Sequence, residues 1–229
     1  MNSSNHPDSN PPDFPAEQST VHLAGPVGSL EALTDWPEEG SPVACSVICH
    51  SVSADGGTLH SKVVQMMERS MRELGAATVR LNFRGVGESE GEFDRGFGEA
   101  EDLVSVASWI RQVLPEAPLW LAGFGFGAYV TARAAPVLKP AQLVSVAPLI
   151  EEFDFEALEL PPCPWLIVQG DQDECVNADA VYQWSQELPQ PPQFIAIEDA
   201  NHDFHRRLMD LRGVLKNGVR RQLSAEQDG

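Results

Sequence analysis

The chain has 229 residues, of which 42% are hydrophobic and 21% charged, a composition that suits one sizeable α/β domain better than two small ones. Its formal net charge of −19 comes from 34 acidic and only 15 basic residues. Such a surface repels phosphate backbones and anionic lipid, so we expect no nucleic acid partner and no membrane partner.

Residues 1–19 are rich in Asn, Ser, Pro and Asp, which predicts a disordered tail before a single domain over 20–229. The tail has neither a basic start nor an apolar segment, so it does not read as a signal peptide, and no apolar run has membrane-spanning length. The cysteines form no C-x-x-C pair and no metal-ligand spacing; they are Cys45, Cys49, Cys163 and Cys175. We therefore expect a soluble cytoplasmic protein with no metal and no cofactor.

In chain order, the first signals are two short strands within 21–37, around a glycine-proline turn. Further strands are predicted at 43–49, 77–83, 119–124, 142–148, 165–170 and 193–199, and helices at 61–75, 99–114, 126–138, 178–188 and from about 203 onward. Because strands and helices alternate, the sequence predicts an α/β fold with a mainly parallel central sheet and helices on both faces.

The segment LAGFGFGAYV (121–130) has the pattern of a strand that turns tightly into a helix. Hydrolytic enzymes place a serine at the apex of such a turn, in the pattern G-x-S-x-G. Here Gly125 stands at the apex and has no side chain, while Gly123 and Gly127 supply the small flanking residues that the turn needs. The segment therefore predicts a nucleophile elbow without its nucleophile.

Two polar segments follow the last two predicted strands. GDQDECV (170–176) offers Asp171 and Asp173, and NHDFH (201–205) offers His202 and His205. The order apex, acid, histidine is the chain order of the α/β-hydrolase triad. The spacing of each residue from its strand favours Asp173 as the acid and His202 as the base.

A nucleotide site is the competing interpretation of the glycines at Gly85, Gly87 and Gly91. Their spacing is G-x-G-x-x-x-G, and no helix begins at the third glycine, where a dinucleotide site needs a helix N-terminus against the pyrophosphate. The sequence also contains no phosphate-binding G-x-x-x-x-G-K-[ST] segment. We expect no nucleotide cofactor.

The segments NFRGVGESEGEFD (82–94), LAGFGFGAYV (121–130), VSVAP (144–148), VQGDQDECV (168–176) and NHDFH (201–205) resemble those of the α/β-hydrolase superfamily. The resemblance is strongest to small bacterial proteins of the dienelactone-hydrolase type that lack a substantial cap domain. It implies hydrolysis of small ester- or acyl-like molecules. It also implies that Asp173 and His202 are the triad acid and base, and that Phe126 and Ser51 form the oxyanion hole.

Three functions stay open because Gly125 cannot form an acyl-enzyme. The chain is a hydrolase whose serine-type catalysis is weak or lost, a non-catalytic pseudo-hydrolase that binds a small molecule or partner, or an active hydrolase. The active form would use water activated by His202 and Asp173, or a relocated nucleophile. Candidates for the latter are Ser51, Ser53, Ser89 and Cys49. His50 is either an oxyanion-loop histidine or a strand-end residue satisfied by the backbone.

Acidic residues crowd two loops that leave the carboxyl ends of strands, namely Glu88, Glu90, Glu92 and Asp94 in one and Glu151, Glu152, Asp154, Glu156 and Glu159 in the other. If both loops frame the site, its entrance is negative and favours a small neutral or cationic ester-like or acyl-like molecule. The alternative is that these residues belong to a generally acidic, solvated surface.

Overall fold

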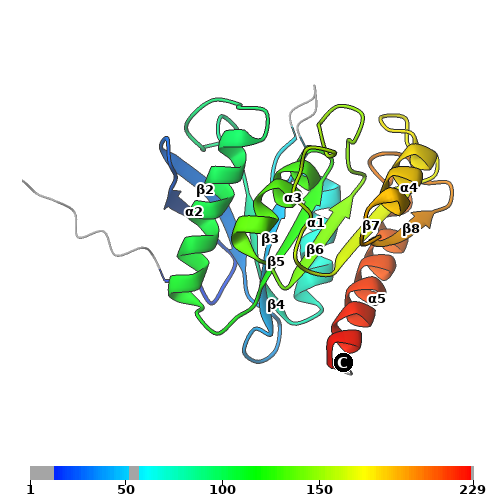
Figure 1. Cartoon of the computed structure of the whole chain (residues 1–229). Coiled ribbons are helices and arrows are strands. Elements are labelled where there is room, and N and C mark those ends of the chain that lie inside the picture. The colour runs from blue at the N-terminus through cyan, green and yellow to red at the C-terminus, as the bar shows by residue number, and fades with distance from the viewer. Residues whose placement is uncertain (1–12, 52–56, 228–229) are drawn as a thin grey trace, which may run out of the picture.

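The computed structural model describes residues 13–51 and 57–227. Within them, the strands are β1 (Ser19–Ala24), β2 (Ser29–Asp35), β3 (Ala44–Cys49), β4 (Ala76–Leu81), β5 (Leu119–Phe124), β6 (Gln142–Val146), β7 (Trp165–Gly170) and β8 (Gln193–Ile197). They form one eight-stranded sheet in the order β1-β2-β4-β3-β5-β6-β7-β8 (Figure 1). The β1–β2 and β2–β4 pairs are antiparallel, and every other neighbouring pair is parallel. The predicted, mainly parallel sheet is confirmed.

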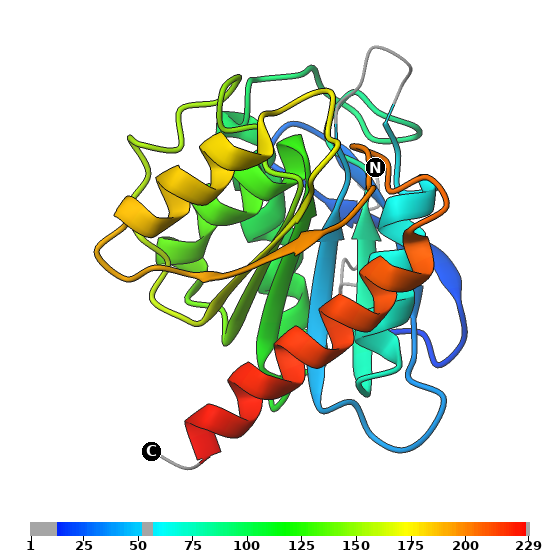
Figure 2. The same ribbon diagram turned by 90° about the vertical axis from the view of Figure 1, so that its right-hand side faces the viewer.

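Helices cover both faces of the sheet. They are α1 (Lys62–Arg72), α2 (Phe97–Val113), α3 (Phe126–Leu138), α4 (Ala178–Glu187) and α5 (Leu208–Gln227). One apolar core lies between the sheet and α2, α3 and α4, and the other lies between the sheet and α1 and α5. Figure 2 shows α5 lying beside α1 on their shared face. The result is the three-layer arrangement that the alternation of strands and helices predicted.

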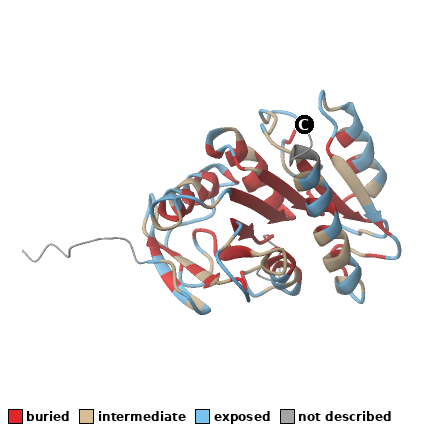
Figure 3. Cartoon of the chain, turned by 90° about the horizontal axis from the view of Figure 1, so that it is seen from below, coloured by how far each residue is buried: buried red, intermediate tan, exposed pale blue. Residues whose placement is uncertain are grey.

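The central strands are buried along their whole length. Every residue of β3, β4, β5, β6 and β7 is buried, as the red strands at the centre of Figure 3 show. In contrast, β2 alternates buried and half-buried residues. Strands covered on both faces need apolar residues at every position, which explains the continuous apolar runs in the sequence.

Two predicted boundaries differ from the structure. The C-terminal helix begins at Leu208 rather than near 203, because Phe204 and Arg206 have φ values of +51° and +63°, which a right-handed helix cannot contain. The folded part begins earlier than the predicted tail allows. Ser19 belongs to β1, and the Phe14 ring lies 5.5 Å from the Trp109 ring. The rest of that tail, residues 1–12, lies outside the described residues.

The carboxyl ends of the parallel strands share one edge of the sheet. Ser51 follows β3, Gly125 follows β5, Asp173 follows β7 and His202 follows β8. Ligands of open α/β sheets bind at this edge. The fold therefore brings four residues that are up to 151 positions apart in the chain to a single place. None of the helices in the described part is long and apolar enough to cross a membrane.

Candidate active site

The elbow between β5 and α3 has the tight geometry that its glycines predicted. Gly125 has φ +55° and ψ −115°, a conformation that costs an L-residue about 1–3 kcal/mol. A Cβ on Gly123 would overlap the backbone of Gly127, and a Cβ on Gly127 would overlap the carbonyl of Cys49. Glycine is therefore required on both sides of the apex, because the strand and helix backbones approach too closely for any side chain.

Asp173 and His202 form a hydrogen-bonded pair beside the apex. His202 Nδ1 lies 2.9 Å from Asp173 Oδ2, and the Asp173 side chain is fully buried. Asp173 also accepts hydrogen bonds from the Gln169 side chain at 2.8 Å and from the backbone N–H of Cys175 and Val176 at 2.8 and 3.1 Å. The competing acid, Asp171, is exposed.

These contacts fix the protonation of the pair. Burial alone would raise the pKa of Asp173, but the hydrogen bond from His202 and those from the two backbone N–H groups lower it below its usual value. The ionised carboxylate accepts a hydrogen bond from Nδ1–H, and in this tautomer of the neutral imidazole the lone pair lies on Nε2. Nε2 faces the elbow, because a Cβ placed on Gly125 would lie 3.6 Å from it. The pair is oriented as a general base aimed at the empty apex.

Backbone and ring contacts hold His202 in this orientation. Its backbone N–H donates to Glu174 Oε2 at 3.1 Å, and its ring lies 5.0 Å from the Phe124 ring at the end of β5. Only 11% of the side chain is exposed. The imidazole is thus held between the loop after β7 and the elbow strand, with little freedom to turn away.

Ser51 and Phe126, the two residues expected to form the oxyanion hole, do meet at the apex. The Phe126 N–H, at the N-terminus of α3, donates to Ser51 Oγ at 3.3 Å. Ser51 is 6% exposed, and its own backbone N–H makes no hydrogen bond to any described residue. The first donor is therefore occupied by a protein hydroxyl. The sequence offered Ser51 as one of four candidate nucleophiles but did not predict its hydrogen bond with the Phe126 N–H.

His50 is a strand-end residue satisfied by the backbone. Its Nδ1 lies 2.8 Å from the carbonyl oxygen of Ser51, and its Nε2 accepts from the Phe83 N–H at 3.2 Å. Because Nε2 is an acceptor, the proton must sit on Nδ1, which donates to Ser51. Burial lowers the pKa of His50 from 6.5 to about 4. His50 is therefore a neutral residue that fixes the Ser51 backbone, which decides between the two interpretations that the sequence left open.

The other candidate nucleophiles lie elsewhere or have structural roles. Ser89 Oγ donates to the carbonyl of Asn82 at 2.7 Å and accepts from the Glu31 N–H at 2.9 Å. Cys49 is completely buried, and burial raises the pKa of its thiol far above the usual value. Ser53 lies outside the described residues. Of the four candidates, Ser51 is the one that the described structure places at the apex.

Aromatic side chains from both mouth loops surround the elbow helix. The Phe126 ring lies 5.3 Å from the Phe93 ring and 4.9 Å from the Phe153 ring. Phe93 is 51% exposed. Phe93 belongs to the loop before α2 and Phe153 to the loop after β6. The site therefore has an apolar wall next to the oxyanion residue.

The acidic residues of the mouth divide into two groups. In the loop before α2, Glu88 contacts His22 at 2.9 Å, Glu90 accepts from the Ser29 N–H at 2.7 Å, and Asp94 accepts from the Gly98 N–H at 3.0 Å. These three carboxylates tie the loop to the β1–β2 hairpin and to α2. In the second loop, Glu151 lines a hollow of about 450 Å³ beside Asp173, whose other carboxylates are Asp171, Glu174 and Asp179.

Among the described residues, one set of side chains has the composition of a metal site. Oxygen, sulfur and nitrogen atoms of Asp173, Cys175 and His202 lie within 4.8 Å of one another. A metal there would compete for the Asp173 carboxylate, which His202 Nδ1 already contacts at 2.9 Å. The same atoms cannot serve a metal and the acid-base pair together, so we assign them to the pair.

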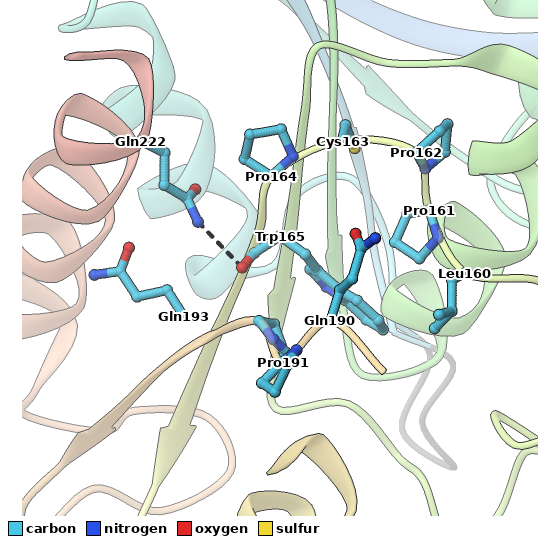
Figure 4. Close-up of a pocket in the computed structure, with 11 residues that line it drawn as sticks. Leu160, Pro161, Pro162, Cys163, Pro164, Trp165, Gln190, Pro191, Gln193 and Gln222 are labelled. Carbon is cyan, nitrogen blue, oxygen red and sulfur yellow. Dashed lines mark hydrogen bonds between the residues drawn. The ribbon is translucent and has the colours of Figure 1, made fainter. Parts of the chain in front are cut away.

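A pocket of about 390 Å³ lies at the opposite edge of the sheet, where β7 and β8 begin (Figure 4). Its walls come from a proline-rich segment at 160–165, a second one at 190–193, and Gln222 of α5. The Gln222 side chain donates to the carbonyl of Trp165 at 3.1 Å. No carboxylate, imidazole or hydroxyl lines this pocket, so it offers no acid-base chemistry comparable with that of the apex.

Residues 45–217 match the α/β-hydrolase domain family, and the chain belongs to this family. Its sheet, elbow and acid-histidine pair are those of an α/β-hydrolase without a lid. It is 47% identical to a lidless α/β serine hydrolase of Xanthomonas campestris, with a TM-score of 0.88 over 92% of this chain and 97% of that one. A serine hydrolase homologue of Coxiella burnetii is 41% identical, with a TM-score of 0.86 over 90% and 99% of the two chains.

A curated relative, an uncharacterized protein of Rickettsia prowazekii, is 31% identical over 78% of this chain and 76% of its own length. The chain is therefore a member of the α/β-hydrolase family and a homologue of serine hydrolases, with Gly125 at the apex of its elbow. The resemblance identified from the sequence is confirmed at the level of the family and of the lidless fold.

Proposed function

We propose that the protein acts on small ester- or acyl-like molecules at the apex site, with the serine-type chemistry of the elbow lost because Gly125 offers no nucleophile. The observation that carries this proposal is the orientation of the His202 ring toward the apex. His202 Nε2 lies 3.6 Å from the position of a Cβ on Gly125, and Asp173 holds the ring by its other nitrogen at 2.9 Å. An imidazole without a role in proton transfer would not need this orientation.

The remaining machinery supports slow turnover. Hydrolases stripped of triad residues still accelerate hydrolysis by about 10³–10⁴ over water, through the oxyanion hole and substrate binding alone. Here the positive end of the α3 dipole and the Phe126 N–H lie at the apex, where an oxyanion would be stabilised. We expect turnover well below that of relatives with an elbow serine, and dependent on His202.

The surroundings favour a neutral or cationic ligand. Phe93 and Phe153 give an apolar wall for an acyl group, whereas the hollow at Asp173 is lined by five carboxylates. A negative entrance raises the local concentration of cations and lowers that of anions, and salt weakens the effect. A choline ester should therefore bind better than a succinate monoester at low salt.

The test compares hydrolysis of p-nitrophenyl acetate by the wild type, His202→Ala and Glu198→Gln. Glu198→Gln is the matched control, because this acid lies close to His202 in the sequence but is exposed. We expect slow hydrolysis that falls roughly 10²-fold in His202→Ala and stays unchanged in Glu198→Gln. Equal rates in all three proteins, after subtraction of the buffer rate, would show that the apex site does not act on esters.

A further inference from the structure

The side chain of Ser51 occupies the space that a side chain at position 125 would need. A Cβ built on Gly125 would overlap Ser51 Oγ and would lie 2.8 Å from Ser51 Cβ. Real Cβ atoms do not approach other carbons this closely, so a side chain at 125 and Ser51 in its present position exclude each other. The hydroxyl group that is missing from the elbow is thus present at the same place, supplied by the loop after β3.

The backbone of Ser51 is held on two sides. The neutral ring of His50 donates to its carbonyl oxygen at 2.8 Å, and a Cβ on Gly57 would overlap that same oxygen. Ser51 is buried, and its Oγ accepts a hydrogen bond from the Phe126 N–H. The hydroxyl is therefore a positioned group rather than a solvated loop serine.

The base borders the same space as this hydroxyl. A Cβ built on Gly125 would overlap Ser51 Oγ and would lie 3.6 Å from His202 Nε2, so the two groups are neighbours of one point at the apex. In the described structure, Nε2 accepts no hydrogen bond and the Ser51 hydroxyl donates none. A donor without an acceptor and an acceptor without a donor share one small, largely buried space. A rotation about χ1 of Ser51 is the movement by which we expect the two groups to meet.

We propose that Ser51 is the nucleophile of this protein, relocated from the elbow to the oxyanion loop. This inference rests on the proposed function and identifies the group that attacks the ester. The mechanism requires two backbone donors for the oxyanion. The Phe126 N–H becomes free as Ser51 Oγ turns toward the substrate, and the Ser51 N–H has no partner among the described residues. In proteases of the chymotrypsin type, the nucleophile's own N–H is likewise one of the two donors.

The chemical step balances without a further reagent. His202 Nε2 takes the proton of Ser51 as Oγ forms a bond to the carbonyl carbon, and the carbonyl electron pair moves to the oxygen that faces the two N–H groups. The tetrahedral intermediate then expels the alcohol, which leaves with the proton from His202. Water repeats the sequence on the acyl-Ser51 ester, releasing the carboxylic acid and restoring the Ser51 hydroxyl and the neutral imidazole.

The experiment is fluorophosphonate labelling of the full chain, with the modified peptide identified by mass spectrometry and p-nitrophenyl acetate hydrolysis measured in parallel. The variants are Ser51→Ala, Ser51→Cys and His202→Ala, and Ser108→Ala is the matched control on the exposed face of α2. We expect one adduct, on Ser51. Labelling should vanish in Ser51→Ala, slow in His202→Ala and stay unchanged in Ser108→Ala.

Ser51→Cys keeps the size of the side chain and should retain an acyl-enzyme that is trapped as a thioester, so it separates loss of the nucleophile from loss of folding. Hydrolysis that depends on His202 but persists in Ser51→Ala, without an adduct, would overturn the role of Ser51 and leave the proposed function standing through activated water. An adduct on a different residue would also overturn it. Hydrolysis that depends on neither residue would overturn both proposals.

Discussion

The Gly125→Ser variant tests the steric relation between the elbow and the oxyanion loop. At φ +55° and ψ −115°, any L-residue at position 125 is strained. In addition, its Cβ would lie 2.8 Å from Ser51 Cβ and would overlap Ser51 Oγ. A serine at 125 therefore introduces two separate costs, one in the backbone and one in packing. The second cost exists only while Ser51 keeps its side chain.

The two costs have similar magnitudes. A strained backbone conformation costs about 1–3 kcal/mol, and overpacking of a buried site costs about 1–3 kcal/mol. Gly125→Ser should lower the free energy of unfolding by the sum of both terms. In the Ser51→Gly background only the strain remains, so the double variant should be more stable than the two single changes predict by about 1–3 kcal/mol, the range of coupling between residues in contact.

Urea unfolding, followed by the fluorescence of the five tryptophans, measures all four proteins of the cycle. Gly40→Ser is the matched control for strain alone, because Gly40 has φ +73° and a Cβ there would meet nothing within 4 Å. Gly213→Ser, in α5 with open space around its Cβ, controls for the added side chain. A coupling below about 0.5 kcal/mol, the limit of ordinary additivity, would refute the claim that Ser51 fills the apex.

Four further predictions concern protons, charges and thiols. Unfolded His50 takes up a proton near pH 6.5 but folded His50 only near 4, so the unfolded chain binds more protons between these values and the wild type loses stability as the pH falls through them. Relative to His50→Gln, the wild type should lose roughly 2–3 kcal/mol of its free energy of unfolding by pH 4.5, as measured by urea unfolding. If the free energies of unfolding of the two proteins fell in parallel with pH, this prediction would be wrong. Asp173→Asn should lower ester hydrolysis to the rate of His202→Ala, because the amide no longer selects the Nδ1–H tautomer; a rate equal to that of the wild type would argue against this pairing. The fully buried Asp102 carboxylate accepts two hydrogen bonds from the Arg84 guanidinium, at 2.7 and 2.8 Å. Arg84→Met removes this cation and should lower the free energy of unfolding by about 3–5 kcal/mol. The second change Asp102→Leu should restore most of that loss in urea unfolding. Ellman's reagent should modify the exposed Cys175 in the folded protein and the buried Cys45 and Cys49 only after unfolding, which peptide mapping of the labelled thiols checks.

The sequence was sufficient for the parts of the site that depend on strand ends. Asp173 and His202 follow β7 and β8 at fixed spacings, and parallel strands bring their carboxyl ends to one edge. The same reasoning separated Asp173 from Asp171. The elbow was recognisable from the local sequence, because the close approach of the backbones permits only glycine at positions 123 and 127.

The contents of the apex could not be predicted in this way. The position of Ser51 Oγ depends on the Phe126 N–H, 75 residues away, and on a histidine whose second partner, Phe83, follows a neighbouring strand. Similarly, the sequence shows the charges of Glu88 and Glu90 but not their partners in the β1–β2 hairpin, 66 and 61 residues away. Contacts between side chains of distant loops leave no periodic pattern in a single sequence.

The mutual exclusion of the side chains at 51 and 125 also makes a serine at the elbow difficult to acquire in evolution. A single change that introduces serine at 125 meets both a strained backbone and the Ser51 side chain, and a loss of several kcal/mol removes much of the stability margin of an ordinary domain. The order of substitutions therefore matters. Position 51 has to become smaller or shift first, and that change would by itself remove the hydroxyl now held at the apex. We therefore expect proteins descended from this chain to keep the hydroxyl on the loop after β3 more readily than to acquire a serine at position 125.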